Sequence, residues 1–194
     1  MDEKTIINYA IEFIESLFAN DYSGHDAEHS KRVYHNAIML ADTEPQCDRF
    51  IISLAALLHD ADDYKLFKTE NNYNARSFLK QCQVDKIKVE HICEIINGVS
   101  FSKNKEHPKT IEGQIVQDAD RLDAIGAIGI ARTFTYGGGC RRSINDTIQH
   151  FNEKLLRIKD EMNTMEGKRL AESRHDFMER FLSELEKEMN IIKI

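Results

Sequence analysis

The chain has 194 residues, of which 41% are hydrophobic and 30% charged, and its formal net charge is -7. This length and balance are typical of one globular domain that buries a sizeable core. A net acidic chain is a poor general binder of nucleic acid or of anionic membranes, so we expect neither partner. No apolar stretch approaches the length of about 18 residues that a membrane span needs, and the N-terminus does not resemble a signal peptide.

The cysteines are widely spaced and form no CxxC pair; they are Cys47, Cys82, Cys93 and Cys140. This pattern resembles neither a disulfide framework nor a zinc knuckle. We therefore predict a protein of the reducing cytoplasm.

Apolar residues recur at helical spacing through most of the chain, and no strand-like alternation of useful length interrupts them. We predict an all-α fold, a single compact helical domain of about seven to eight helices over residues 1–194. In chain order the helices are expected at about residues 3–20, 26–41, 48–59, 75–82, 87–98, 112–134, 144–163 and 165–189. Asp26 is the expected N-cap of the second helix. Residues 60–72 are polar and irregular, and residues 100–110 are predicted to form a mobile loop.

Several local signals refine the second half of the chain. Gly126 and Gly129 are costly inside a helix and indicate close approach between helices. The glycine run 137–139 is expected to break the chain. Ser143, with Asp146 three residues later, indicates a helix start.

Four residues form the most informative pattern. His59 and Asp60 end an apolar helical run, His29 stands upstream, and Asp120 stands downstream. Two imidazoles and two carboxylates form a mixed ligand set that suits Mn, Fe, Zn or Ni and leaves coordination positions open. These residues are far apart in the chain, so only tertiary folding can bring them together.

The same residues carry a family resemblance. The order His29, then His59-Asp60, then Ala119-Asp120-Arg121-Leu122 resembles the HD-domain metal-dependent phosphohydrolases. The flanking stretches 24–33 and 117–127 are similar to the small stand-alone bacterial subgroup of that superfamily. The resemblance runs from about residue 21 to the C-terminal helix. It implies hydrolysis of phosphoester or phosphoanhydride bonds, with His29, His59, Asp60 and Asp120 as metal ligands.

The fourth ligand has a rival. Asp118 and Asp120 are two residues apart on one helix, so their side chains point roughly 200° apart and cannot easily share one ion. Asp120 matches the Asp of the family's Ala-Asp-Arg-Leu pattern, and we favour it over Asp118. Asp123 lies on the same helix face and could support the site.

The resemblance also implies a general base. In several HD phosphohydrolases an acidic residue three positions after the Asp ligand orients or deprotonates the attacking water, and here that position is Asp63. Its neighbour Asp62 is easily confused with it.

A phosphorylated substrate needs cations. We predict Lys65 as a catalytic cation and Arg32, His25 and Arg121 as substrate-binding groups. The weaker candidates are Arg132, Lys154, Arg169 and Arg174.

The extra histidine cluster of the cyclic-dinucleotide phosphodiesterase branch is absent, which favours one divalent ion: Mn first, with Zn, Fe, Ni or Mg as alternatives. The subgroup often carries an aromatic residue at the position of Ala27. The expected substrate is a small phosphorylated molecule, with a nucleotide favoured. A homodimer is left open.

Two other functions compete with this interpretation. His25 to His29 also fits HxxEH, the inverted zinc-peptidase motif, with Glu28 as its base. That reading leaves His59, Asp60 and Asp120 without a role. The second competitor is a non-catalytic, metal-stabilised helical module that senses a nucleotide; it would not need Asp63.

Overall fold

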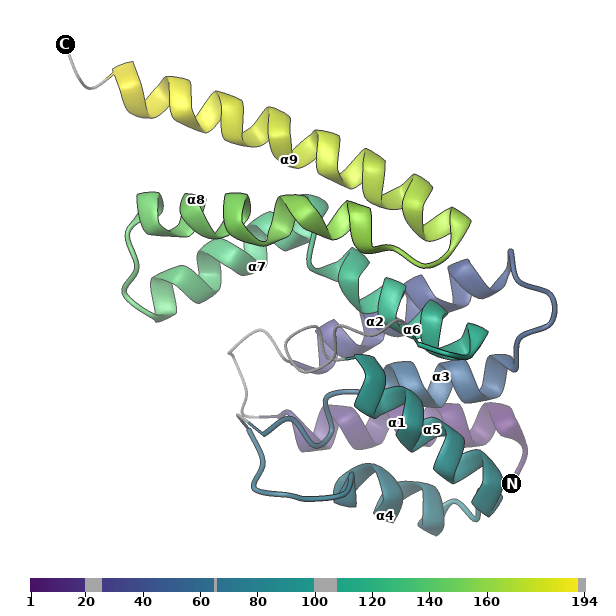
Figure 1. The fold of residues 1–194 in the computed structure, drawn as a ribbon. Coiled ribbons are helices and arrows are strands. Elements are labelled where there is room, and N and C mark those ends of the chain that lie inside the picture. The colour runs from purple at the N-terminus through teal and green to yellow at the C-terminus, as the bar shows by residue number, and fades with distance from the viewer. Residues whose placement is uncertain (20–25, 65, 100–107, 192–194) are drawn as a thin grey trace. The chain divides into compact units, whose positions relative to one another are not determined.

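A computed structural model describes residues 1–19, 26–64, 66–99 and 108–191 of the chain. These residues form nine α-helices and one 3-10 helix, with no strand among them, so the predicted all-α class is confirmed (Figure 1). The chain divides into two compact units, Met1–Asp120 and Arg121–Ile194. The organisation as one domain over residues 1–194 stays a prediction. Within the described ranges, every helix is too short or too polar to cross a bilayer.

The first unit contains five complete helices and most of a sixth. They are α1 (Glu3–Leu17), α2 (Ala27–Ala41), α3 (Arg49–Leu58), α4 (Tyr73–Gln81), α5 (Lys86–Val99) and the start of α6 (Ile111–Asp123). The predicted starts at Asp26 and Asp48 are confirmed, because the Asp26 carboxylate accepts the N–H of His29 and that of Asp48 accepts the N–H groups of Phe50 and Ile51.

The centre of this unit is α3, whose residues from Phe50 to Leu58 are all buried. A helix that is apolar around its whole circumference needs neighbours on every side. Helices α1, α2 and α5 pack against it. The buried helix ends at Leu58, so its C-terminus places His59, the C-cap residue, and Asp60 side by side.

Polar contacts hold α6 to the rest of the first unit. The side-chain amide of Asn36 on α2 donates to the carbonyl of Ala119 at 3.3 Å. The Glu112 carboxylate at the start of α6 accepts the backbone N–H of Asp48 at 3.0 Å. These contacts hold α6 against α2 and the start of α3. Asp120, which follows Ala119 on α6, therefore lies next to α2.

The second unit contains α7 (Gly126–Gly139), α8 (Ile144–Glu153), a 3-10 helix η1 (Leu155–Glu161) and α9 (Met165–Ile191). Helix α9 packs on α7 and on η1, and α8 packs on α7 and η1. The predicted start of α8 is confirmed, since Ser143 and Asp146 form a reciprocal capping box.

The predicted single helix over residues 112–134 is wrong, because α6 ends at Asp123 and α7 begins at Gly126. Gly126 has φ +75°, a left-handed conformation that interrupts the helix and that residues with a side chain rarely adopt. A Cβ on Gly129 would lie 2.3 Å from the carbonyl oxygen of Ala124, so Gly129 permits this tight corner and not a helix–helix contact. The expected close approach between helices holds at Gly126, whose added Cβ would meet the side chain of Arg174 on α9.

Two further boundaries differ from the predictions. The glycine run 137–139 does not break the chain but forms the last turn of α7, which ends at Gly139 with Cys140 as its C-cap. The predicted helix 144–163 changes to 3-10 geometry after Glu153. The predicted mobile loop 100–110 lies largely outside the described residues, which omit 100–107.

Candidate metal centre

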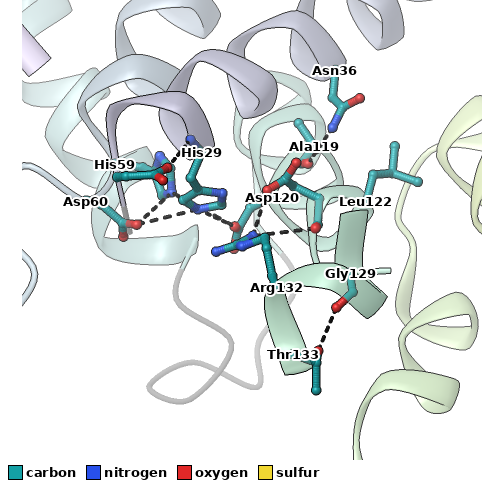
Figure 2. A network of polar contacts seen from close by, with 12 residues as sticks. His29, Asn36, His59, Asp60, Ala119, Asp120, Leu122, Gly129, Arg132 and Thr133 are labelled. Carbon is teal, nitrogen blue, oxygen red and sulfur yellow. Dashed lines mark hydrogen bonds and ion pairs between the residues drawn. The ribbon is translucent and has the colours of Figure 1, made fainter. Parts of the chain in front are cut away.

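Two imidazoles and two carboxylates of the first unit meet at one point (Figure 2). The Nε2 atoms of His29 and His59 are 3.2 Å apart. One oxygen of Asp60 lies 3.5 Å from His29 Nε2 and 3.3 Å from His59 Nε2. One oxygen of Asp120 lies 3.4 Å and 3.9 Å from the same two nitrogens. The structure thus brings together all four predicted ligands, and His29, His59 and Asp120 alone already form a group able to hold a metal ion.

Three helices supply these side chains. His29 lies in the first turn of α2, where the Asp26 carboxylate accepts its backbone N–H at 2.8 Å. His59 caps the C-terminus of α3 and Asp60 follows it. Asp120 comes from α6. His59 and Asp60 can serve one ion although they are adjacent, because α3 ends at Leu58 and the 100° offset of regular helix does not apply beyond that end.

The His59 ring is fixed by the backbone of its own helix. Its Nδ1 lies 2.8 Å from the carbonyl oxygen of Ala56, so Nδ1 carries a proton and donates it. The lone pair of the neutral ring is then on Nε2, which faces the other three ligands. A backbone carbonyl that holds the second ring nitrogen in this way is typical of histidines that bind metals.

The electrostatics of the cluster require a positive charge. Burial opposes the charged imidazole, but the Asp60 and Asp120 carboxylates and the Ala56 carbonyl together outweigh burial and raise the pKa of His59 to about 9. Burial would also raise the pKa of Asp120, but the hydrogen bond with His29 and the charge of His59 hold that pKa below its ordinary value. Two neutral Nε2 lone pairs at 3.2 Å would repel each other, so a proton or a cation must lie between them. A divalent ion fits this donor set.

The side chains on α6 separate the two rival carboxylates. Asp120 reaches the two imidazoles and keeps 26% of its side chain exposed. Asp118 is fully buried and lies outside the metal-binding group. Asp123, the expected support, belongs to the second unit and pairs at 2.6 Å with Arg132 there.

The acidic turn after Asp60 distinguishes Asp62 from Asp63. Both oxygens of Asp62 accept backbone N–H groups at the start of α4, from Asn74 at 2.9 Å and Ala75 at 3.1 Å. Asp63 is half-buried, three residues after Asp60. Asp62 is thus occupied as a helix cap, and Asp63 stays the predicted base.

The predicted cations have different surroundings. Arg32 is half-buried one turn after His29 on α2. Arg121 is buried in the second unit, where its guanidinium donates to the backbone carbonyl of Glu161 and lies 3.4 Å from its carboxylate. His25 and Lys65 lie outside the described residues. The roles of all four stay predictions.

Of the weaker cation candidates, Arg169 and Arg174 contact groups of the second unit, and Lys154 is half-buried. Arg169 pairs with Glu166 on the surface of α9. Arg174 donates to the carbonyl of Leu122. Lys154 is half-buried at the end of α8.

The orientation of Glu28 weighs against the zinc-peptidase alternative. His29 is 2% exposed, whereas Glu28 is 67% exposed and pairs with Lys31 at 2.8 Å on the outer face of α2. In that alternative Glu28 would have to act beside the His29 ligand. The His29 side chain instead points toward the site, and the Glu28 side chain points toward solvent.

Two amides that shape the site were missed by the sequence analysis. Asn36 holds α6 through the Ala119 carbonyl, and Asn74 donates to the Ala61 carbonyl at 2.8 Å. Each connects segments far apart in the chain. No local pattern marks such a partner, so only tertiary structure identifies these residues.

Comparisons with known proteins agree with this geometry. The family model described as "HD domain" matches residues 26–125, which contain all four predicted ligands. The protein YpgQ of Bacillus subtilis is 40% identical over 189 residues, covering 91% of this chain and 90% of YpgQ. The crystal structure of YpgQ in complex with ADP superposes with a TM-score of 0.85 at 35% identity in the structural alignment, covering 97% of each chain. An HD-superfamily hydrolase from Bacillus thuringiensis superposes with a TM-score of 0.80 at 40% identity, covering 97% of this chain and 99% of that one. The chain is similar in structure to an HD-superfamily hydrolase, and it belongs to the HD domain family.

Proposed function

We propose that the protein is a metal-dependent phosphohydrolase that cleaves phosphoester or phosphoanhydride bonds of nucleotides. The observation that carries this proposal is the convergence of His29, His59, Asp60 and Asp120, with Nε2 and carboxylate oxygens 3.2–3.9 Å apart. Mixed nitrogen and oxygen sets of this kind suit catalytic ions, because they leave positions for water and substrate.

The four side chains would hold one divalent ion, with Mn²⁺ as the first candidate. Such an ion supplies Lewis acidity that polarises a phosphoryl oxygen and makes a nearby water a stronger nucleophile at neutral pH. The protein's own contribution is placement. The Ala56 carbonyl holds the His59 ring, and Asp26 and Asn36 set α2 and α6.

Asp63 supplies the proton acceptor in this proposal. It lies on the turn that begins at Asp60, since its N–H donates to the Asp60 carbonyl at 3.0 Å. A half-buried carboxylate on this turn can orient the attacking water and take its proton as the new phosphorus–oxygen bond forms and the phosphorus–oxygen bond to the leaving group breaks, with the electron pair going to the leaving oxygen. Arg32, one helical turn after His29, is the proposed contact for substrate phosphate, because a guanidinium matches the geometry of phosphate oxygens.

A nucleotide is the proposed substrate class because the related YpgQ was crystallised with ADP. Over nearly its whole length this chain superposes on that protein, so a similar ligand can be tested directly. We further propose a cytoplasmic enzyme, in keeping with the absence of CxxC pairs among its four cysteines.

A nucleotide panel tests the proposal. The native protein is incubated with Mn²⁺ and nucleoside mono-, di- and triphosphates, and released phosphate and pyrophosphate are measured separately. We expect turnover that EDTA abolishes and that Asp60→Ala removes. Asp42→Ala is the matched control, because Asp42 is a 64%-exposed carboxylate of the same unit that pairs with Arg49. If the Mn²⁺-loaded protein binds nucleotides but cleaves none, the non-catalytic sensor replaces the enzyme.

A further inference from the structure

The segment after His59 is a tight turn with a functional residue at each end. The Asp63 N–H donates to the Asp60 carbonyl at 3.0 Å, so residues 60–63 form one turn. Asp60 is a proposed metal ligand and Asp63 the proposed base. The conformation of the two residues between them, Ala61 and Asp62, therefore sets the spacing of ligand and base.

Helix α4 holds both of these central residues. The Asp62 carboxylate accepts the N–H of Asn74 at 2.9 Å and that of Ala75 at 3.1 Å. In return, the Asn74 side-chain amide donates to the carbonyl of Ala61 at 2.8 Å. These three hydrogen bonds form a reciprocal clamp between the turn and the first residues of α4.

Asp62 replaces the cap that α4 would otherwise have from its own sequence. The N-cap residue of α4 is Asn72, which is left-handed at φ 54° and makes no side-chain capping bond. Its side chain points to α5 instead, donating to Asn97 Oδ1 at 3.1 Å and to the Cys93 carbonyl at 3.4 Å. The start of α4 is thus hydrogen-bonded to α5, which packs on α3, so the clamp is connected to the buried helix of the unit.

We infer that Asp62 and Asn74 are positioning residues of the active site, which hold the turn so that Asp60 reaches the metal and Asp63 reaches the attacking water. This inference rests on the proposed function. Both Asp62 oxygens accept backbone N–H groups and the Asn74 amide donates to the Ala61 carbonyl, so the role inferred for both side chains is to hold the turn.

The test compares Asp62→Ala with Asp85→Ala. Asp85 caps the start of α5 in the same unit, accepting the N–H groups of Ile87 at 2.9 Å and Lys88 at 3.4 Å, so its loss costs a similar helix cap away from the site. Dissociation constants for Mn²⁺ are measured by isothermal titration calorimetry, melting temperatures by calorimetry, and kcat and KM with the best nucleotide of the panel.

We expect both variants to melt at lower temperature. Asp62→Ala should also weaken Mn²⁺ binding by about 10- to 100-fold, the usual cost of losing a residue that orients metal ligands, and should lower kcat more than it raises KM. Asp62→Asn keeps one acceptor oxygen, so its Mn²⁺ affinity and its kcat should lie between those of Asp62→Ala and those of the native protein. Asp85→Ala should bind Mn²⁺ within about twofold of the native protein.

If Asp62→Ala matches Asp85→Ala in Mn²⁺ affinity and kcat, the inference is overturned. Should Asp62→Ala fail to fold, Asn74→Ala decides the question, since it removes only the bond to the Ala61 carbonyl and leaves the N–H groups capped. Native metal affinity and turnover in that variant would refute the positioning role. If the native protein binds Mn²⁺ but cleaves no nucleotide, the proposed function fails while the comparison of Mn²⁺ affinities still tests the clamp.

Discussion

Replacing His29 with alanine tests the proposed metal centre, because the Nε2 atom of His29 lies within 3.5 Å of an atom of each of the other three proposed ligands. The Nε2 of His29 lies 3.2 Å from His59 Nε2, 3.5 Å from an Asp60 oxygen and 3.4 Å from an Asp120 oxygen. Without it, one imidazole and two carboxylates remain, with His59 at 3.3 Å from Asp60 and 3.9 Å from Asp120.

The expected loss of Mn²⁺ affinity follows from the proposed role of the His29 ring as a direct metal ligand. A residue that only orients a ligand is worth about 10- to 100-fold in metal affinity, so loss of a ligand should cost at least about 100-fold, or about 2.7 kcal/mol. With Mn²⁺ at 100 times the native dissociation constant, binding stabilises the native protein by about 2.7 kcal/mol, but the variant by only about 0.4 kcal/mol. At about 2–4 °C per kcal/mol for a chain of this size, Mn²⁺ should raise the native melting temperature by about 5–10 °C and that of His29→Ala by about 1–2 °C.

The assay is scanning calorimetry with and without Mn²⁺, with EDTA-treated protein as reference. His35→Ala is the matched control, because His35 lies on the same helix and is exposed, with its Nδ1 2.6 Å from the Lys31 carbonyl oxygen and its ring against that of Tyr34. It should keep the full Mn²⁺-dependent rise. A rise of native size in His29→Ala would refute the assignment of His29 as a ligand.

Three further predictions concern carboxylates. Asp120→Asn should weaken Mn²⁺ binding by at least about 100-fold, and Asp118→Asn far less, because only Asp120 reaches the imidazoles; the reverse order in metal titrations would transfer the ligand role to Asp118. Asp63→Asn should keep Mn²⁺ and substrate affinity but lower kcat by about 10²- to 10⁴-fold, as expected for loss of a general base; unchanged turnover in steady-state kinetics would exclude that role. Burial favours a neutral Asp48, but the hydrogen bond from Lys88 and the α3 N–H groups outweigh it and lower the pKa of Asp48. The charged form is therefore the stabilising one, and its contribution is present above pH of about 4 and lost as the pH falls through the lowered pKa. Asp48→Ala should cost about 1–2 kcal/mol at pH 7 in urea unfolding and less at pH 3; an equal cost at both values would contradict this account.

The sequence determined the features that depend on nearby residues. Helical periodicity and capping signals predicted the all-α class and the starts at Asp26, Asp48 and Ser143, because helix formation and capping involve residues within one or two turns. Helical geometry also separated Asp118 from Asp120, since side chains two positions apart on a helix point in nearly opposite directions. The ordered residues His29, His59, Asp60 and Asp120 were predicted as metal ligands, and the structure brings these four side chains together.

Only the tertiary structure decided the features that depend on distant partners. The break between α6 and α7 requires the left-handed Gly126 and the close carbonyl of Ala124, neither of which alters the apolar periodicity that predicted one helix. The different surroundings of Asp62 and Asp63 follow from the N-terminus of α4, whose backbone N–H groups bond both oxygens of Asp62. Backbone donors brought in from another part of the chain leave no trace in the local sequence, and for that reason two adjacent aspartates that look alike in the sequence have different surroundings in the folded protein.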